Sequence, residues 1–156
     1  MLIREAKPSE AKQLTAIAVA AKQHWGYSPE AMNKWIRTLT VTRTAIESNP
    51  TFVAEADTLL GFYMLWTDGR AWELEHMWVA PPFMRQGVGR ALLAHSANFA
   101  RARDAKILRI DADPNAEAFY RACGAVRLGV VAAPIAEQPQ RVRPILTLRL
   151  SEDAAR

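Results

Sequence analysis

Residues 71–112 constrain the fold of this chain more than any other segment. A strand pattern at 71–79 ends at Pro81-Pro82, because proline has no backbone N–H to donate to a sheet. Residues 87–103 then place apolar side chains at the spacing of one helix face, and 106–112 form a second strand pattern. A helix between two strands favours a right-handed crossover that makes the strands parallel neighbours. The segment therefore predicts an α/β sheet with a parallel pair.

Further strand and helix patterns flank this segment on both sides. Asp68-Gly69 is a strong hairpin turn, so the strands around it should pair antiparallel. Ser28-Pro29 supplies a helix cap and a first-turn proline. The remaining expected strands are 2–4, 51–56, 59–67, 126–132 and 145–150, and the remaining expected helices are 9–22, 29–37 and 115–123, with a helical turn at 44–48. We predict one domain over residues 1–156, of the α/β (α+β) class, with a mixed, mostly antiparallel sheet of about seven strands and about four helices.

Composition narrows the class of protein. The only cysteine, Cys123, excludes an internal disulfide and a cysteine-based metal site. The net charge of +4 and the pI of about 9.6 raise nucleic-acid binding as an alternative, but the basic residues are scattered in ones and twos. Charges interrupt the N-terminal residues, and no apolar run is long enough to span a membrane. We therefore expect a cytoplasmic protein with no nucleic-acid or membrane partner.

Two alternating glycines, Gly87 and Gly89, stand where the helix after the first parallel strand begins. The first N–H groups of a helix have no partner within the helix, and glycine lets a ligand approach the backbone closely. Arg85 and Arg90 add positive charge on either side. The turn can cradle a diphosphate, although a plain loop-to-helix turn is the alternative for this motif alone. It is not a P-loop, which would end in Gly-Lys-Ser/Thr, nor a dinucleotide fingerprint, which would need a glycine where Leu92 stands.

Two motifs together resemble those of the GNAT (GCN5-related) N-acetyltransferase superfamily. Its first signature, Arg/Gln-x-x-Gly-x-Gly/Ala, matches at Gly87 and Gly89, while Met84 stands at the first signature position and Arg85 one place later. Its second block, which contains Asn-x-x-x-Phe-Tyr followed by glycine, matches residues 114–125. The blocks come in the expected order, with a helix and a strand between them.

The resemblance implies acetyl-CoA (coenzyme A) as the co-substrate and no metal. In this superfamily the strand before the glycine turn splays from its parallel neighbour, and pantetheine enters the gap. Met84 at the variant position leaves the pyrophosphate contact mainly to the backbone of residues 85–90. The residues implied in cofactor binding are Met77, Trp78, Val79, Met84, Arg85, Gln86, Gly87, Val88, Gly89, Arg90, Asn115 and Tyr120.

Acetyl transfer to an amine needs a proton acceptor, because a free amine with a pKa of about 10.4 is mostly protonated at neutral pH. Glu73 and Glu75 lie two residues apart on the expected strand and therefore share a face. The resemblance points to Glu73, six positions before the strand's last residue, Val79, and leaves Glu75 as the reserve. A water chain could replace either one, and a cation such as Arg70 could instead satisfy the carboxylates.

Tyr120 is implied by the resemblance as the general acid that protonates the leaving thiolate, with a hydrogen bond to the pantetheine arm as a second role. A phenol with a pKa of about 10 can donate to a basic thiolate. The alternative is a core tyrosine that packs with Phe119. Asn115 is expected to cap the same helix. Cys123 has no histidine near it in sequence, so direct attack by the amine in a ternary complex is expected rather than an acetyl-cysteine.

Four residues are candidate contacts for the acceptor. Trp25 and Tyr27 lie in a loop that roofs the acceptor pocket in the superfamily, and a cationic amine could rest on their rings. Glu73 is the third candidate, and the charge of Arg143 suits a carboxylate or phosphate. Trp25 to Ser28 and Arg143-Pro144 also resemble a bacterial subgroup of uncertain substrate.

The sequence thus predicts an N-acetyltransferase for a primary amine of a small molecule or peptide, and leaves a homodimer open. A catalytically silent acyl-CoA-binding or sensor domain is the alternative. A nucleic-acid-binding module rests on the pI alone.

Overall fold

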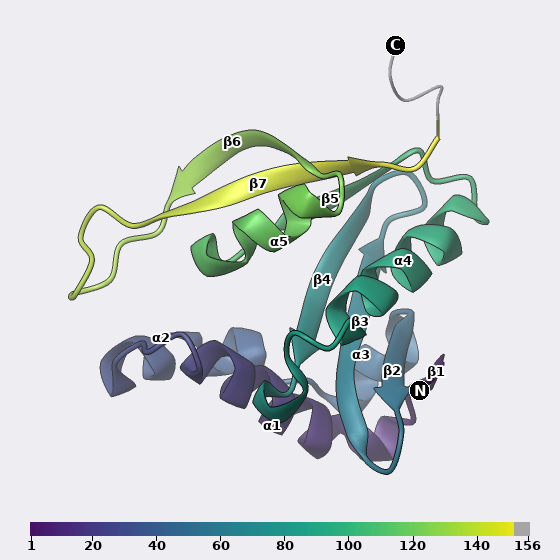
Figure 1. Ribbon diagram of the computed structural model, residues 1–156, viewed down its shortest axis with the longest axis horizontal. Helices are drawn as coiled ribbons and strands as arrows, with labels where there is room; N and C mark the ends of the chain where they lie inside the picture. The colour runs from purple at the N-terminus through teal and green to yellow at the C-terminus, as the bar shows by residue number, and fades with distance from the viewer. Residues whose placement is uncertain (152–156) are drawn as a thin grey trace. The chain divides into compact units, whose positions relative to one another are not determined.

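A computed structural model describes residues 1–151 of the chain (Figure 1). Those residues form one seven-stranded sheet in the order β1-β2-β3-β4-β5-β7-β6. The strands are β1 (Leu2–Glu5), β2 (Thr51–Glu55), β3 (Leu59–Thr67), β4 (Trp72–Val79), β5 (Ile107–Asp111), β6 (Val126–Ala132) and β7 (Val142–Arg149). The helices are α1 (Ala11–Gln23), α2 (Pro29–Leu39), α3 (Arg43–Ser48), α4 (Val88–Arg101) and α5 (Glu117–Ala122), with short 3-10 helices at Pro8–Glu10, Pro81–Phe83 and Pro114–Ala116.

The predicted fold class is confirmed. The β4–β5 pair is parallel and flanks α4 in the chain, whereas β1–β2, β2–β3, β5–β7 and β6–β7 are antiparallel. The predicted helical turn near residue 44 is a short helix, α3, which Thr42 caps by accepting from the backbone N–H of Ala45.

The predicted start of the last strand was wrong. β7 begins at Val142, not at residue 145, and therefore contains Pro144 opposite Val130. Proline argues against an interior strand because it cannot donate to a ladder. The Pro144 carbonyl still accepts a hydrogen bond from the backbone N–H of Ala112, at 3.1 Å. The missing N–H of Pro144 does not end the strand. The sequence pattern could not show this, because it marks proline only as a strand breaker.

Two compact units make up the chain. The first unit contains residues 1–66 and 76–96, and the second contains residues 67–75 and 97 onward. Both β4 and α4 contribute residues to each unit. Every helix in the described part of the chain is too short or too polar to cross a membrane.

The first unit has its core between β2, β3 and the helices. Val53, Phe62 and Leu65 are fully buried with Leu14 of α1. A Cβ at Gly61 would lie 2.6 Å from the Trp78 carbonyl oxygen, so only glycine allows β3 to approach β4 this closely.

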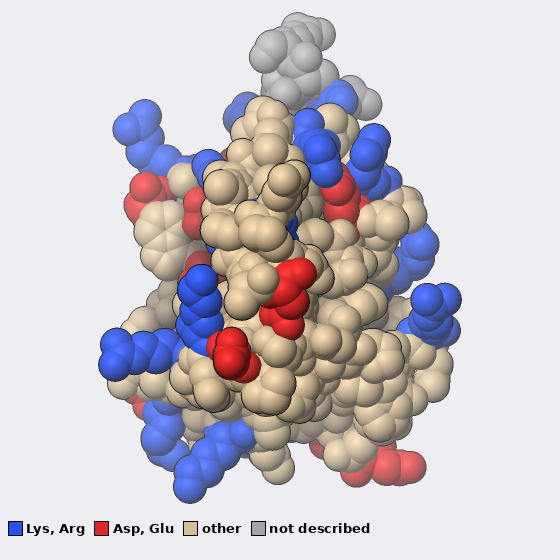
Figure 2. All heavy atoms as spheres, turned by 90° about the vertical axis from the view of Figure 1, so that its left-hand side faces the viewer, with Lys and Arg blue, Asp and Glu red and all other residues tan. Residues whose placement is uncertain are grey.

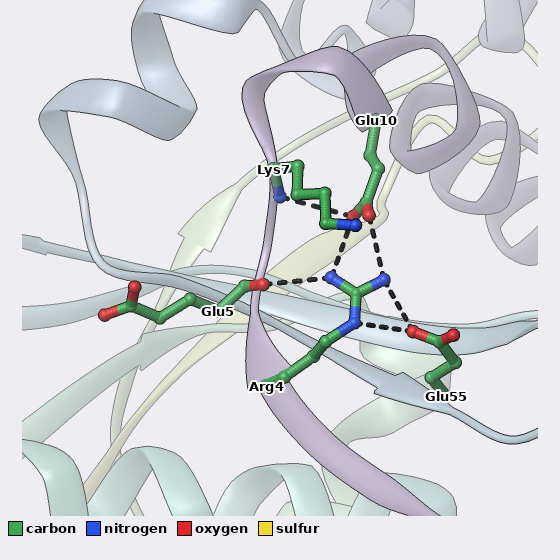
Figure 3. Close-up of polar contacts among 5 residues, drawn as sticks. All are labelled: Arg4, Glu5, Lys7, Glu10 and Glu55. Carbon is green, nitrogen blue, oxygen red and sulfur yellow. Dashed lines mark hydrogen bonds and ion pairs between the residues drawn. The ribbon is translucent and has the colours of Figure 1, made fainter.

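The edge strand β1 is fixed by an arginine (Figure 3). Arg4 donates to the carboxylates of Glu10, at 2.8 Å, and Glu55, at 2.5 Å. These contacts join β1 to the following 3-10 helix and to β2. The Arg4 side chain therefore links three elements at the outer side of the sheet.

The second unit packs α5 and the end of α4 with β5 and β7. Leu108, Ile110 and Leu146 are buried almost completely. The parallel ladder pairs Glu73 of β4 with Arg109 of β5, and Leu74 with Ile110. β4 continues to Val79 beyond this ladder.

Candidate active site

The turn between β4 and α4 has an uncommon backbone. Arg85 has φ of 63° and Gly87 has φ of 86°, so two left-handed residues lie on either side of Gln86. For a residue with a Cβ, as at Arg85, this conformation costs on the order of 1 kcal/mol. Backbone N–H groups at the start of a helix have no partner within the helix, and such a start is a common anion site. The geometry fits the diphosphate cradle predicted for this turn.

Side chains around the turn leave its backbone accessible. Arg85, Gln86, Gly87 and Arg90 are exposed, while Val88 is buried and anchors the start of α4. Gln86 donates from its side-chain amide to the Pro82 carbonyl, at 3.2 Å, which closes the turn on itself. Nothing lies within 4 Å of a Cβ built at Gly87. Glycine is therefore needed here for its φ rather than for space.

The last residues of β4 precede this turn. Met77, Trp78 and Val79 are half-buried, and Met84 is half-buried as well. The Trp78 indole donates to Nδ1 of His76, at 3.1 Å, so the proton of the neutral His76 ring is on Nε2. Burial lowers the pKa of His76 to about 4, and the ring stays neutral at physiological pH. His76 and Trp78 thus form a neutral hydrogen-bonded pair on β4, the strand expected to bind pantetheine.

Three carboxylates share one face of the sheet in the second unit. Glu73 and Arg109 are register partners, and alternation places Glu75 and Asp111 on the same face as that pair. Glu73 has a cation nearby, with Arg109 Nε 3.9 Å from its carboxylate. Glu75 instead has carboxylates around it. Its pKa is raised by desolvation first, and then by the charges of Glu73 and Asp111.

The charge of Arg143 is already paired. Its guanidinium donates from Nε and Nη2 to the two oxygens of Asp111, at 2.8 and 3.1 Å. This contact raises the pKa of Arg143 and fixes the side chain beside the acidic face. The prediction that Arg143 contacts an acceptor stays a prediction, and an acceptor carboxylate would compete with Asp111 for it.

Tyr120 lies on α5 and is buried. Burial raises the pKa of its phenol strongly, and the nearby Cys123 and Asp113 raise it further. The phenol is therefore protonated throughout the physiological range, as a proton donor must be. Its ring also contacts Phe119 edge to face, with 5.2 Å between the centroids, so the packing role expected as the alternative is present too.

The loop between α1 and α2 holds Trp25 and Tyr27. Trp25 is 40% exposed, whereas Tyr27 is buried and meets Trp35 edge to face, at 4.7 Å. The ammonium of Lys22 lies 5.3 Å from the Tyr27 centroid and 4.2 Å from the Trp35 centroid. A cation of the chain itself thus rests on Tyr27, one of the two rings that the sequence assigned to a cationic acceptor. Trp25 is the exposed aromatic of this loop.

The chain matches one protein-family model over most of its length. Residues 13–125 match the family model described as the acetyltransferase (GNAT) family, which is more than half of the chain. The chain belongs to the GNAT acetyltransferase family. No curated protein sequence matches it significantly.

Solved structures share the fold of this GNAT chain. A GCN5-related N-acetyltransferase from Rhodopseudomonas palustris is 23% identical, with a TM-score of 0.78 over 95% of this chain and 94% of that one. The PaiA N-acetyltransferase of Thermoplasma acidophilum, in complex with coenzyme A, is 19% identical, with a TM-score of 0.73 over 95% and 98%. YncA of Salmonella typhimurium, a putative acetyltransferase with its cofactor acetyl-CoA, is 19% identical, with a TM-score of 0.71 over 97% and 95%. At these identities the likeness establishes the fold.

The predicted site residues of this GNAT domain divide between the two units. The first unit holds the glycine turn, the end of β4, Trp25 and Tyr27. The second unit holds Glu73, Glu75, Asn115, Tyr120 and Arg143. Glu75, Glu73 and Asp111 are electrostatically coupled within the second unit, and Arg109 and Arg143 neutralise part of that group.

The helix cap at Asn115 was predicted wrongly. The residue that caps is Asp113, whose carboxylate accepts from the backbone N–H of Asn115, at 2.8 Å, and from its side-chain amide, at 2.9 Å. Ala116 stands at the N-cap of α5 itself, and the segment opens with a 3-10 turn from Pro114. The signal was present, because an aspartate before a proline at the first helical position is a strong start signal.

Asp113 and Lys22 are the residues that the sequence did not single out. Asp113 also forms an ion pair with Arg141, at 3.3 Å, and both side chains are almost completely buried, 5% and 2% exposed. Lys22 is buried over two aromatic rings. Nothing in the local pattern marks either as buried, since isolated Asp, Arg and Lys residues are usually solvated.

Proposed function

We propose that this chain transfers an acetyl group from acetyl-CoA to a primary amine. The observation that carries the proposal is the turn before α4, where the left-handed residues Arg85 and Gly87 are exposed at the start of the helix, beside the exposed Arg90. Membership of the GNAT family supports the reaction class. The coenzyme A and acetyl-CoA named for the Thermoplasma and Salmonella structures support the donor.

The turn is assigned to the pyrophosphate of the donor. Backbone N–H groups of residues 85–90 would bind the phosphate oxygens, and Arg85 and Arg90 would add charge from exposed side chains. Met84 at the first signature position supplies no charge, so the backbone N–H groups would make most of the contacts to the pyrophosphate. Val79 and the residues before it would align the pantetheine arm through main-chain hydrogen bonds.

A carboxylate of β4 is assigned as the base. Glu75 suits this role better than Glu73, because its raised pKa makes it the stronger proton acceptor once ionised, while Glu73 has Arg109 beside it. Glu75 would take a proton from the acceptor ammonium, directly or through water. The freed amine then attacks the thioester carbonyl carbon. Backbone N–H groups at the end of β4 would stabilise the resulting oxyanion.

Tyr120 is assigned as the acid. As the tetrahedral intermediate collapses, the carbon–sulfur bond breaks and the thiolate takes the phenolic proton of Tyr120. The acetylated nitrogen then gives up its extra proton to the tyrosinate, directly or through water, which restores the phenol. The raised pKa of Tyr120 keeps the phenol protonated until the thiolate forms, although it also makes the phenol a weaker acid. The products are the N-acetylated amine and the free thiol of coenzyme A.

A silent acyl-CoA-binding domain is the second candidate. The departure at Met84 and the pairing of Arg143 with Asp111 favour it, since both weaken the side-chain complement of the site. Binding without turnover would separate this candidate from the enzyme.

The deciding experiment is an acceptor screen. The chain is incubated with acetyl-CoA and a panel of polyamines, aminoglycosides, amino acids and peptides with free N-termini, and free thiol is measured. Amine-dependent thiol release that Tyr120→Phe lowers, while coenzyme A binding is retained, supports transfer. Tight binding of coenzyme A with no thiol release from any acceptor supports the silent domain instead.

A further inference from the structure

β6 is an edge strand whose seven residues are all exposed. It pairs with β7 along one edge and is the last strand of the sheet, so its other edge has no neighbouring strand in the described part of the chain (Figure 1). Large apolar side chains dominate it. Leu128 is 69% exposed and Val126 is 64% exposed, and Val130 and Val131 are also exposed. An edge strand presents a row of backbone N–H and C=O groups, so β6 offers both hydrogen bonds and apolar surface to a partner strand.

The devices that usually protect an edge strand are mostly missing from β6. It contains no proline and no lysine, and its one charged residue, Arg127, is paired with both carboxylate oxygens of Glu117, at 2.6 Å each. A bulge between Arg127 and Gly129 is the one irregularity. By contrast, β1 at the other edge has four residues, two of them charged.

We propose that β6 pairs antiparallel with β6 of a second copy of this chain across a two-fold axis. The strand is its own complement. In the register that pairs all seven residues, Gly129 lies on the axis, Leu128 faces Val130, and Arg127 faces Val131. Only a register centred on Arg127 would place two guanidinium groups opposite each other. The paired segment would be about 24 Å long, at roughly 3.4 Å per residue.

The charge pattern favours a second copy over an unrelated peptide. A foreign strand is selected by pockets or by opposite charge, and β6 has no charge left to offer because Glu117 holds Arg127. In the register centred on Gly129, by contrast, every apolar side chain of β6 except Val131 would face another apolar side chain. A two-fold interface requires this kind of self-complementary patch. The exposed Val142 on the neighbouring β7 would extend the apolar surface.

The first test measures mass against concentration. Sedimentation velocity of the full chain should show the 17.4 kDa monomer giving way to a species of twice that mass as concentration rises. Leu128→Lys places two ammonium groups close to the axis and should raise the dissociation constant at least tenfold. Ile36→Lys on α2, where Ile36 is 48% exposed, is the matched control and should leave association unchanged. Circular dichroism confirms that both variants are folded.

The second test fixes the register. Gly129→Cys in a Cys123→Ser background puts one cysteine on the axis, and a Cβ at Gly129 meets nothing within 4 Å. Opposed residues of antiparallel strands have Cα atoms about 4.5–5.5 Å apart, within the range of a disulfide. Oxidation should give a covalent dimer, while Ile36→Cys in the same background should give no covalent dimer.

Three results would overturn the proposal. They are a monomer at every concentration, a dimer that Leu128→Lys does not weaken, and equal cross-linking of the two cysteine variants. A monomer that binds an added peptide along β6 would also overturn it, since the occupant would then be a foreign strand.

Discussion

The two glutamates of β4 differ in their surroundings, although the resemblance pointed to Glu73 as the base and left Glu75 as the reserve. Glu73 and Glu75 share a strand face and a residue type, and only Glu73 lies six positions before Val79. In the structure Arg109 approaches Glu73, at 3.9 Å, while the neighbours that shift Glu75 are carboxylates. Asp111 and Arg109 come from β5, which is distant in sequence from both glutamates. A local pattern can therefore nominate a pair of bases, but only the tertiary contacts indicate which one is the better proton acceptor.

Glu75→Gln should abolish most of the activity. Removing a general base costs about 10²–10⁴-fold in kcat, and Glu73→Gln should cost much less. The acid limb of the pH–rate profile should lie above the ordinary range of a glutamate, because the pKa of Glu75 is raised. Asp111→Asn removes a like charge, and should move that limb to lower pH. Equal losses for Glu73→Gln and Glu75→Gln, or an unmoved limb, would contradict this assignment.

Glu75 should also change how the free energy of unfolding depends on pH. A carboxyl whose pKa is higher in the folded than in the unfolded state favours folding below its unfolded pKa, and this contribution is lost as pH rises through the folded pKa. Urea midpoints of the wild type should therefore fall relative to those of Glu75→Gln between acidic and neutral pH. Parallel pH profiles for the two proteins would count against a raised pKa.

Gly87→Ala should weaken coenzyme A binding. Gly87 has φ of 86° and Gly69 has φ of 94°, and a Cβ at either would meet nothing within 4 Å. Alanine at either position should therefore cost a similar amount of stability, about 1–2 kcal/mol. Only the change at Gly87 should lower the affinity, by about tenfold or more, measured by isothermal titration calorimetry. If Gly69→Ala lowered the affinity equally, the turn would not be the binding site.

At the scale of elements, local signals predicted type and order well and boundaries less well. The hairpin at Asp68-Gly69, the crossover helix and the strands around it follow from turn chemistry and periodicity. The start of β7 was missed because Pro144 marks a break by rule, yet its carbonyl still joins the sheet. The exposure of β6 could not be predicted from the sequence either, because an apolar strand pattern predicts burial and does not indicate where the strand lies in the sheet.

Asp113→Ala should destabilise the second unit. The aspartate caps the 3-10 turn and pairs with Arg141, and both side chains are buried. Breaking a buried ion pair by removing one partner costs about 3–5 kcal/mol, because the other charge stays uncompensated. Asp113→Asn keeps an acceptor for the cap and should cost less. Asn115→Ala, which leaves the backbone N–H in place, is the control and should cost about 1 kcal/mol or less. Urea denaturation measures all three.

At the scale of the whole molecule, charge gives little support to nucleic-acid binding. Arg4, Arg127, Arg141 and Arg143 are each held by carboxylates. On the face drawn in Figure 2, blue Lys and Arg side chains are scattered, with red Asp and Glu side chains among them. That face has no continuous basic patch of the kind that follows a phosphate backbone. The pI alone cannot decide on nucleic-acid binding, because it counts charges without their partners, and the absence of a nucleic-acid partner stays a prediction.

Binding of the donor should be visible in the stability of the whole chain. A ligand that binds only the folded state adds about 2.7 kcal/mol when its concentration is one hundred times its Kd. For a chain of 156 residues this corresponds to a rise in Tm of roughly 5–10 °C, at about 2–4 °C per kcal/mol. Coenzyme A should give this shift in a thermal melt, and adenosine, which lacks the phosphates, should give little. Gly87→Ala should reduce the shift at the same coenzyme A concentration, while Gly69→Ala should retain it. A shift of equal size with adenosine would mean that recognition does not depend on the pyrophosphate, and the glycine turn would lose its role.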